Sequence, residues 1–374
     1  RNLKGSGLPV KIPAIEMVEI GAGGGSIASV DALGRVAVGP ESVGSQPGPA
    51  CYNQGGERAA VTDADLVLGK IDPAAFAGGT VALAPEKASE ALERTIGQPL
   101  GMDAALAAFA VAEIVDENMA NAARVHAVEW GKDVAARAMI AFGGAAPLHA
   151  ARLAEKLNLS QVIVPAGAGV GSAVGFLRAP ISYEVVRSRY MRLDGFDAAG
   201  ANELLAAMQA EATAIVRQGA PDAALSETRL AFMRYVGQGH EITVPLPPRA
   251  LEPADAKTLR AAFEAAYRAL YGQTVPGQEP EILSWTLTVA SPAVSSAVKA
   301  AAAATVAGKP IGTRRLFDPQ AQAFVEAAVW RRESLGTAVV AGPALIVEDQ
   351  TTTVVPDGFS AEVGLGGALV LTRR

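Results

Sequence analysis

The chain has 374 residues, of which 50% are hydrophobic and 19% charged, a composition typical of a globular protein. Its net charge of −6 and its 5% of aromatic residues disfavour nucleic acid and membrane surfaces as partners, because the chain offers neither a basic surface nor stacking platforms. Cys51 is the single cysteine, so an intramolecular disulfide is excluded and a reducing cytoplasm is compatible. We expect a cytoplasmic protein of two or three domains that binds small molecules or other proteins.

The first motif is the glycine-rich stretch GAGGGS at 21–26. Apolar strand candidates flank it on both sides, VKIPAIEMVEIG before and SIASVDALGRVAVGPES after, with turn signals at Asp31, Gly34 and Gly39. The stretch 43–69 that follows is rich in glycine and proline, and we expect it to be a long irregular loop. Loops of this kind are usually functional or covered by a partner.

Residues 84–131 have apolar side chains at three- and four-residue spacing, which predicts helices that stop near Gly131. Two units of strand, glycine turn and helix follow at 137–157 and 161–177, and repeated units of this kind are typical of an α/β domain. After about residue 188 the order is helix, two strands, helix and strand, which predicts an α+β module. The alanine-rich segment 294–310 reads as a linker, and short strands beyond residue 312 predict a small β-domain. The expected domains are therefore 1–188, 189–295 and 296–374.

Two segments could contact a nucleotide. FGGAAPLHA at 142–150 places a Gly-Gly turn between a strand and a helix, which lets backbone N–H groups approach a ligand; close packing of strand on helix is the alternative. His149 lies in the first turns of that helix, where it is either a packing or capping residue or a chemical group. GAGGGS could contact phosphate, yet a strand rather than a helix follows it, so a plain turn is the alternative.

Carboxylates occur in two further places. Asp63 and Asp65 lie two residues apart and could face Mg²⁺, although an acidic residue beside Thr62 before an apolar run is also typical of a helix cap. Glu113, Asp116, Glu117 and Asn118 share one face of a predicted helix, which is either solvated or buried with a carboxylate of raised pKa. Cys51 lacks a basic neighbour, so we do not expect it to be a nucleophile.

The blocks VEIGAGGGSIASVDALGRVAVGPES, GPACYNQGG, VTDADLVLG, AFGGAAPLHAARLAEKL and GPALIVEDQTTTVVPDGF, in this order, closely resemble the hydantoinase A, 5-oxoprolinase and acetone carboxylase β-subunit family. The resemblance implies an α/β fold of the actin, Hsp70 and sugar-kinase type, present in part, followed by the α+β module and the small C-terminal β-domain. It implies ATP and Mg²⁺ as cofactors, and a bacterial hetero-oligomer with a second, B-type subunit.

The activity implied by the resemblance is ATP-dependent opening of a cyclic amide or imide of the hydantoin or 5-oxoproline type, by phosphorylation of a carbonyl oxygen. One alternative is the β-type subunit of an ATP-dependent ketone carboxylase. The other is a non-catalytic assembly fragment that docks a B-type subunit. The family's Asp-x-Gly-Gly-Thr phosphate motifs do not occur here, so we expect the C-terminal part of a longer subunit, inactive as this fragment alone.

The resemblance also assigns residues. Family members usually have glycine where this chain has Ala146, whose methyl group could crowd an adenosine, and more often have asparagine at Asp65. The implied roles are Gly23, Gly24, Gly25 and Ser26 facing phosphates, Gly143, Gly144 and Ala145 lining the adenosine, His149 anchoring its helix, Glu117 and Asn118 in the cleft wall, and Asp63 as a metal ligand.

Overall fold

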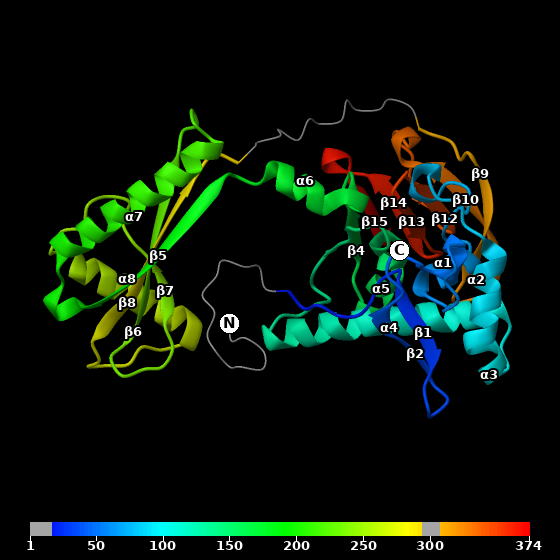
Figure 1. Ribbon diagram of the computed structural model, residues 1–374, viewed down its shortest axis with the longest axis horizontal. Coiled ribbons are helices and arrows are strands. Elements are labelled where there is room, and N and C mark those ends of the chain that lie inside the picture. The colour runs from blue at the N-terminus through cyan, green and yellow to red at the C-terminus, as the bar shows by residue number, and fades with distance from the viewer. Residues whose placement is uncertain (1–16, 294–306) are drawn as a thin grey trace. The chain divides into compact units, whose positions relative to one another are not determined.

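A computed structural model of the chain describes residues 17–293 and 307–374. The chain divides into two compact units. The larger unit comprises the parts of the chain before residue 175 and after residue 297, and the smaller unit comprises residues 175–297. Figure 1 shows the elements of both units, which are described separately below.

The larger unit begins with an antiparallel hairpin of β1 (Ser26–Val30) and β2 (Val36–Ser42). Its turn is closed by the carboxylate of Asp31, which accepts the N–H groups of Leu33 and Arg35, both at 2.9 Å. The strand predicted before the glycine-rich stretch is absent from its described part, 17–21, whereas its residues 10–16 lie outside the described residues. The glycines therefore lead into the hairpin instead of joining its two strands.

Helices fill the middle of this unit, as the spacing of apolar residues predicts. The longest, α4, is capped at its start by Asp103, whose side chain accepts the N–H of Leu106 at 2.8 Å. One short helix, α1, lies inside the stretch predicted to be irregular. The helical segments are η1 (Ala50–Tyr52), α1 (Val61–Val67), η2 (Phe76–Gly79), α2 (Pro85–Leu92), the π-helical turn η3 (Glu93–Gly97), α3 (Gln98–Leu100), α4 (Ala104–Glu129), α5 (Ala146–Leu157) and η4 (Ala168–Val170). The next helix, α6 (Gly171–Arg178), crosses the division between the two units at residue 175.

The two predicted units of strand, glycine turn and helix are present as β3 (Met139–Ile140) with α5 and β4 (Gln161–Val164) with α6. β3 and β4 are parallel neighbours in a five-stranded sheet of order β11-β14-β15-β4-β3. The other three strands come from the C-terminus: β11 (Val340–Ala341), β14 (Phe359–Val363) and β15 (Leu369–Arg373). Figure 1 shows β14 and β15 of this sheet near β4.

The C-terminal strands thus differ from the expected separate β-domain at 296–374. Leu369 and Leu371 of β15 pair with Val164 and Val162 of β4, and all four side chains are buried in one core with α5. Burial of these apolar side chains is favourable only when the terminal segment completes the earlier sheet. A second sheet of the same unit has the order β13-β12-β10-β9. Its strands are β9 (Gly312–Asp318), β10 (Ala323–Arg331), β12 (Ala344–Val347) and β13 (Thr352–Val355). The turn η6 (Arg332–Ser334) follows β10, and the turn η7 (Leu365–Gly367) lies between β14 and β15 of the first sheet.

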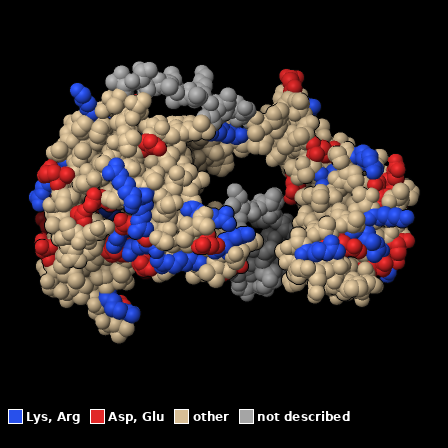
Figure 2. Space-filling model, turned by 180° about the vertical axis from the view of Figure 1, so that it is seen from behind, with Lys and Arg blue, Asp and Glu red and all other residues tan. Residues whose placement is uncertain are grey.

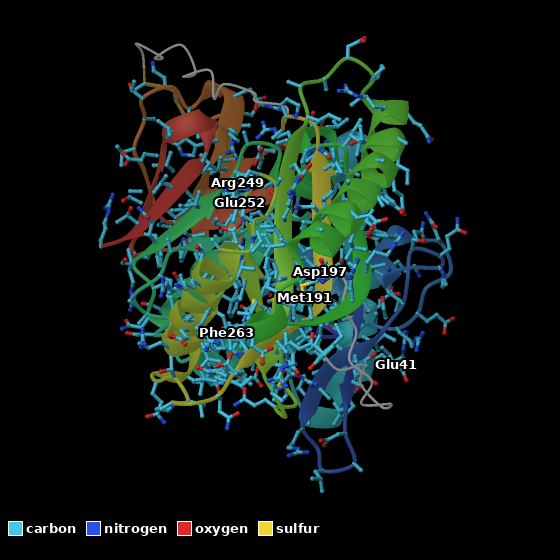
Figure 3. The ribbon with its side chains drawn as sticks, turned by 90° about the vertical axis from the view of Figure 1, so that its left-hand side faces the viewer. Glu41, Met191, Asp197, Arg249, Glu252 and Phe263 are labelled. Carbon is cyan, nitrogen blue, oxygen red and sulfur yellow. The ribbon has the colours of Figure 1, made fainter. Side chains whose placement is uncertain are left out.

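The smaller unit has the predicted α+β order. Its antiparallel sheet, β5-β8-β6-β7, packs against α7 and α8 around the fully buried side chains of Trp285, Phe263 and Tyr235. Arg249 and Glu252 lie in the loop that precedes α8 (Figure 3), where the guanidinium of Arg249 and the backbone N–H of Glu252 donate to the carboxylate of Asp255. The bounds are β5 (Ser182–Arg192), η5 (Leu193–Gly195), α7 (Ala198–Gly219), β6 (Ser226–Tyr235), β7 (Ile242–Pro245), α8 (Asp255–Tyr271) and β8 (Pro280–Ala290).

On the face of the larger unit seen in Figure 2, positive and negative side chains lie side by side. Within residues 17–293 and 307–374, no single helix is both long enough and apolar enough to span a membrane. By length and composition alone, only the bent pair 85–100 and 104–129 meets that test.

Candidate functional site

Three helices of the larger unit bring their polar side chains together around His149 of α5. Nδ1 of His149 lies 2.8 Å from Oδ1 of Asp116 on α4, and Nε2 lies 3.0 Å from Oδ2 of Asp65 on α1. Nζ of Lys70 donates to Oδ1 of Asp65 at 2.8 Å. The side chains of His149, Asp65 and Asp116 are all less than 5% exposed. We call these four residues the buried charge network.

The apolar pattern of the helices explains why the charge network is buried. Asp116 lies among the buried residues of α4, next to Val115 and one turn after Ala112. This helix packs against α1. His149 lies between the buried Leu148 and Ala150 of α5. Each polar side chain is therefore carried into the interior by apolar neighbours on its own helix, and it needs partners there because an unpaired buried charge is costly.

The electrostatics of the network favour a charged histidine. Burial by itself lowers the pKa of His149, but the carboxylates of Asp65 and Asp116 outweigh this effect and raise the pKa to about 9. Burial works in the opposite sense on Asp65, whose pKa is nevertheless held well below its usual range by His149 and Lys70. The pKa of Lys70 is raised against its burial by Asp65 and Asp116. With both ring nitrogens bonded, His149 joins α1, α4 and α5 and is not poised as a general base.

A pocket of about 60 Å³ opens beside the network. Lys70 and Asp116 line it together with Glu113 and Arg152, whose side chains form two hydrogen bonds of 2.7 and 3.0 Å with each other. The remaining walls are mostly apolar and come from α4, α5, β9, β10 and the segments beside them. They include Leu68, Phe109, Leu148, Leu316, Phe317, Val325, Pro343, Val354 and Pro356.

The Gly-Gly turn predicted at 143–145 lies immediately before α5. Gly143 has a φ of +113°, a conformation that L side chains rarely adopt, and its N–H donates to the carbonyl of Ala168 in the neighbouring β4–α6 loop at 2.7 Å. Gly144 is exposed, and its carbonyl accepts the hydroxyl of Thr351 at 2.8 Å. The Gly-Gly turn after β3, the glycine-containing loop between β4 and α6 and the loop before β13 therefore meet at the carboxyl end of β3 and β4. Open α/β sheets typically bind ligands at this end.

Ala146, where the family usually has glycine, is the first residue of α5. Its side chain is partly buried and packs against the core of the sheet. The methyl group is therefore directed into the protein and does not by itself block the exposed turn at Gly144. The backbone of the turn is open to solvent at Gly144.

The GAGGGS stretch is packed against other parts of the larger unit. Gly24 accepts both the N–H and the hydroxyl of Thr62, at 2.8 and 2.9 Å, and Gly25 accepts the N–H of Val43 at 2.9 Å. A Cβ atom on Gly24 would lie 2.6 Å from Oγ1 of Thr62, whereas one on Gly23 would meet nothing within 4 Å. Packing thus accounts for the glycine at position 24, and contact with phosphate stays a prediction for this loop.

Ser26 closes the same loop on itself. Its hydroxyl accepts the N–H of Gly23 at 3.0 Å and donates to the carbonyl of Gly21 at 3.1 Å. Ser26 is buried, with 5% of its surface exposed. Its oxygen therefore shapes the loop in this structure.

Asp63 organises the chain that precedes it. Its carboxylate accepts the N–H groups of Ala50, Cys51 and Ala60, at 3.2, 2.7 and 2.8 Å. Asp63 is the third residue of α1 and bonds back to Ala60, the residue before the helix, so it supports the start of the helix without being the N-cap residue that the sequence offered as the alternative. Among the described residues, no group of three or more His, Cys, Asp or Glu side chains is arranged to hold a metal ion. The role of Asp63 as a metal ligand stays a prediction.

Glu117 and Asn118 are not brought to the glycine turn. Glu117 pairs with Arg124 and Lys156, at 2.8 and 3.2 Å, and Lys156 lies near the end of α5. Lys156 is ten residues from the start of α5, a distance of about 15 Å at 1.5 Å per residue. Asn118 donates instead to the carbonyl of Val38 in β2, at 3.5 Å. The two side chains join α4 to its neighbours.

Sequence reasoning did not single out Lys70, and it treated Asp65 only as a metal candidate. A lysine after an apolar helix is common, and no local pattern marks it as buried. The polar residues 113 and 116–118 within an otherwise apolar helix were the one signal available, and Asp116 among them is buried. The raised pKa expected for a carboxylate here is wrong for Glu113, because hydrogen bonds from Arg152 and Lys156 outweigh its burial and hold its pKa below the usual value.

The chain matches two family models, hydantoinase/oxoprolinase over residues 2–185 and the hydantoinase/oxoprolinase C-terminal domain over 204–365. It is 30% identical to the caprolactamase subunit alpha of Pseudomonas jessenii, over 97% of this chain and 53% of that subunit. A nucleotide-free acetone carboxylase has the same fold with a TM-score of 0.79 and 28% identity, over 94% of this chain and 52% of that chain. The ATP-dependent caprolactamase of P. jessenii gives a TM-score of 0.71 and 30% identity, over the same shares. The chain thus spans about half the length of the curated relatives it matches.

Proposed function

This chain belongs to the hydantoinase/oxoprolinase family, and on that premise we propose that it is the nucleotide-binding part of a subunit that opens a cyclic amide at the expense of ATP. The observation that carries the proposal is the pair of glycine turns at the carboxyl end of β3 and β4, exposed at Gly144, in a chain that shares its fold with an ATP-dependent caprolactamase. The proposed fold type is that of the actin, Hsp70 and sugar-kinase proteins, present in part.

Gly143, Gly144 and Ala145 would hold the adenosine of ATP, because the backbone there is open to solvent and lies at the start of α5. ATP, when bound, supplies the phosphoryl group that activates the carbonyl of the ring. His149 acts indirectly: its bonds to Asp65 and Asp116 hold α5, and with it the turn, against α1 and α4. Gly23, Gly24, Gly25 and Ser26 are proposed to face the phosphates, with Mg²⁺ as their counter-ion.

A second candidate activity is ATP-dependent carboxylation of a ketone, which is favoured by the higher TM-score of the acetone carboxylase structure, 0.79 against 0.71. Both candidates need the same nucleotide site, so the site alone does not separate them. We further propose that the chain works in a bacterial cytoplasm within a hetero-oligomer that contains a B-type subunit. An assembly role without catalysis is the remaining alternative for the chain by itself.

The nucleotide proposal is tested by calorimetric titration of the chain with ATP and MgCl₂. Gly144→Asp adds a carboxylate to the exposed turn, and we expect it to weaken binding at least about tenfold through repulsion and lost access. Gly239→Asp is the matched control, because a Cβ there meets nothing within 4 Å and the residue lies in the smaller unit. Equal affinity of Gly144→Asp and the unchanged chain would contradict the adenosine assignment.

The two candidate activities are distinguished by an assay of the subunit together with its partner. The full-length subunit is co-purified with any bound subunit, and ATP hydrolysis is measured with a lactam and, separately, with acetone and bicarbonate. Stimulation by the lactam alone is expected. Stimulation only by the ketone would favour carboxylation, and a complex that forms but never hydrolyses ATP would favour the assembly role.

A further inference from the structure

The two loops that are proposed to contact ATP are each attached to the first turn of a helix. The carbonyl of Gly24 in the GAGGGS stretch accepts the N–H and the hydroxyl of Thr62, the second residue of α1, at 2.8 and 2.9 Å. The Gly-Gly turn at 143–144 leads directly into α5, whose first residue is Ala146. The spacing of the two loops therefore follows the relative position of α1 and α5.

One hydrogen bond joins these two helices. Oδ2 of Asp65 on α1 lies 3.0 Å from Nε2 of His149 on α5, and in the described part of the chain no other hydrogen bond or ion pair runs from α1 to α5. Asp65 is three residues beyond Thr62, and His149 is three residues beyond Ala146, a rise of about 4.5 Å along each helix at 1.5 Å per residue. The bond thus lies within one helical turn of the point where each loop joins its helix.

Both partners of this bond are also held on their other side. Nζ of Lys70 donates to Oδ1 of Asp65 at 2.8 Å, and Oδ1 of Asp116 on α4 lies 2.8 Å from Nδ1 of His149. The side chains of Asp65 and His149 are 2% and 4% exposed, so water does not compete for their bond. Because both carboxylate oxygens and both ring nitrogens are bonded, the pair is fixed in one geometry. The link between α1 and α5 is consequently a stiff one.

The remaining bonds of the Gly-Gly turn do not reach the GAGGGS stretch. Gly143 donates to the carbonyl of Ala168, and Gly144 accepts the hydroxyl of Thr351, so both bonds fix the turn to loops of the sheet. The bond between Asp65 and His149 is what connects the helix under one loop directly with the helix under the other.

A ligand that contacts both loops depends on their spacing more than a ligand that contacts one. When the loops are held at a fixed separation, the second contact forms within the complex, and little of its gain is lost in ordering the protein. ATP would contact both loops, adenosine only the Gly-Gly turn, and inorganic tripolyphosphate only GAGGGS. Loosening the link should therefore weaken the binding of ATP and spare that of its two fragments.

We propose that the bond between Asp65 and His149 sets the spacing of the two ATP loops, which makes both side chains positioning residues that touch neither the adenosine nor the phosphates. The inference rests on the proposed function for the two contacts with ATP. The bond, its burial and its place between the two helices do not depend on that function.

The proposal is tested by titrating the chain with Mg-ATP in a calorimeter, and with adenosine and magnesium tripolyphosphate by ligand-observed NMR. Asp65→Ala and His149→Gln break the bond from opposite ends, since glutamine cannot bridge two carboxylates from opposite sides of a ring. Each variant is expected to weaken ATP binding at least about tenfold and to leave the affinities for adenosine and tripolyphosphate within about twofold. Circular dichroism identifies which variants are folded, and one folded variant is sufficient for the comparison.

Thr62→Val tests the attachment of the other loop with the charge network intact. It removes the hydroxyl bond to Gly24, and it should weaken ATP binding at least about threefold while adenosine binding stays within about twofold. Asp255→Ala is the matched control, because it removes a buried, paired carboxylate from the smaller unit, and no affinity should change by more than about twofold.

Equal affinity of the folded variants and the unchanged chain for ATP would overturn the spacing role. A parallel loss for ATP, adenosine and tripolyphosphate would overturn it as well, because it would indicate a general structural role. Absence of ATP binding by the unchanged chain would contradict the proposed function and this inference with it, whereas ATP binding that does not respond to the variants contradicts the spacing role alone.

Discussion

Nδ1 of His149 and Oδ1 of Asp116 lie 2.8 Å apart in the interior of the larger unit, although 33 residues separate them in the chain. The bond fastens α5 to α4, and the second ring nitrogen fastens α5 to Asp65 of α1. The exposed glycine turn that we assign to the nucleotide lies directly before α5. The position of that turn therefore depends on side chains that the nucleotide does not touch.

Removing Asp65 should destabilise the larger unit strongly. Asp65→Ala takes away the carboxylate that both His149 and Lys70 contact, and breaking a buried ion pair from one side typically costs about 3–5 kcal/mol. We expect a loss of that order in the free energy of unfolding measured in urea. Glu211→Ala, which breaks an exposed pair with Arg187, should cost below about 1 kcal/mol. Similar losses in the two variants would argue against the network as a tertiary clamp.

The raised pKa of His149 predicts a pH dependence of stability. The pKa is about 9 in the folded chain against 6.5 for an unperturbed histidine, so the folded state holds the proton more tightly. The contribution is fully present below pH 6.5 and is lost as the pH rises through about 9. We expect the free energy of unfolding to fall between these pH values in the unchanged chain and to fall less in His149→Gln. Parallel pH profiles for the two proteins would refute the charged histidine.

Gly23 and Gly24 should differ in their tolerance of a side chain. Gly24→Ala places Cβ against the hydroxyl of Thr62 and strains the bond between them, so we expect it to lose about 1–3 kcal/mol of stability. In Gly23→Ala the new Cβ has no neighbour within 4 Å, so the free energy of unfolding should change by no more than about 0.5 kcal/mol. Thermal unfolding of the two variants measures this difference. If Gly23→Ala instead abolished ATP binding with stability unchanged, the phosphate role of this loop would gain its first direct support.

Cys51 should be inert in the folded chain. It is fully buried, and burial together with the nearby Asp63 carboxylate raises the pKa of its thiol far above the usual range. A thiol reagent such as Ellman's should therefore react slowly with the native protein and quickly after denaturation in guanidinium chloride. The denatured chain provides the control, because its single cysteine must react with one equivalent of the reagent and release one equivalent of the coloured thiolate. Fast reaction of the native protein would contradict the packing around residue 51.

Local sequence patterns were sufficient for most helices and strands. The three- and four-residue spacing in 84–131 is present as α2 to α4, and the Gly-Gly turn at 143–144 separates a strand from a helix as expected. The strand expected before GAGGGS is absent from the described part of that segment, 17–21, because an apolar run resembles a strand whether or not another strand is available to pair with it. The same reasoning placed the C-terminal strands in a domain of their own, although β15 completes the sheet of β4.

The sequence by itself determined the order of elements and the glycine turns, since these depend on periodicity and on backbone freedom within a few residues, and the order of its motif blocks carries the resemblance to the family. Tertiary structure alone decided which polar side chains matter chemically. Asp65 and His149 lie 84 residues apart, and only the packing of apolar helix faces carries both into a dry interior. There, water no longer screens their charges, so histidine keeps its proton, and Lys70 and Asp116 are held at the end of a pocket that no short motif encodes.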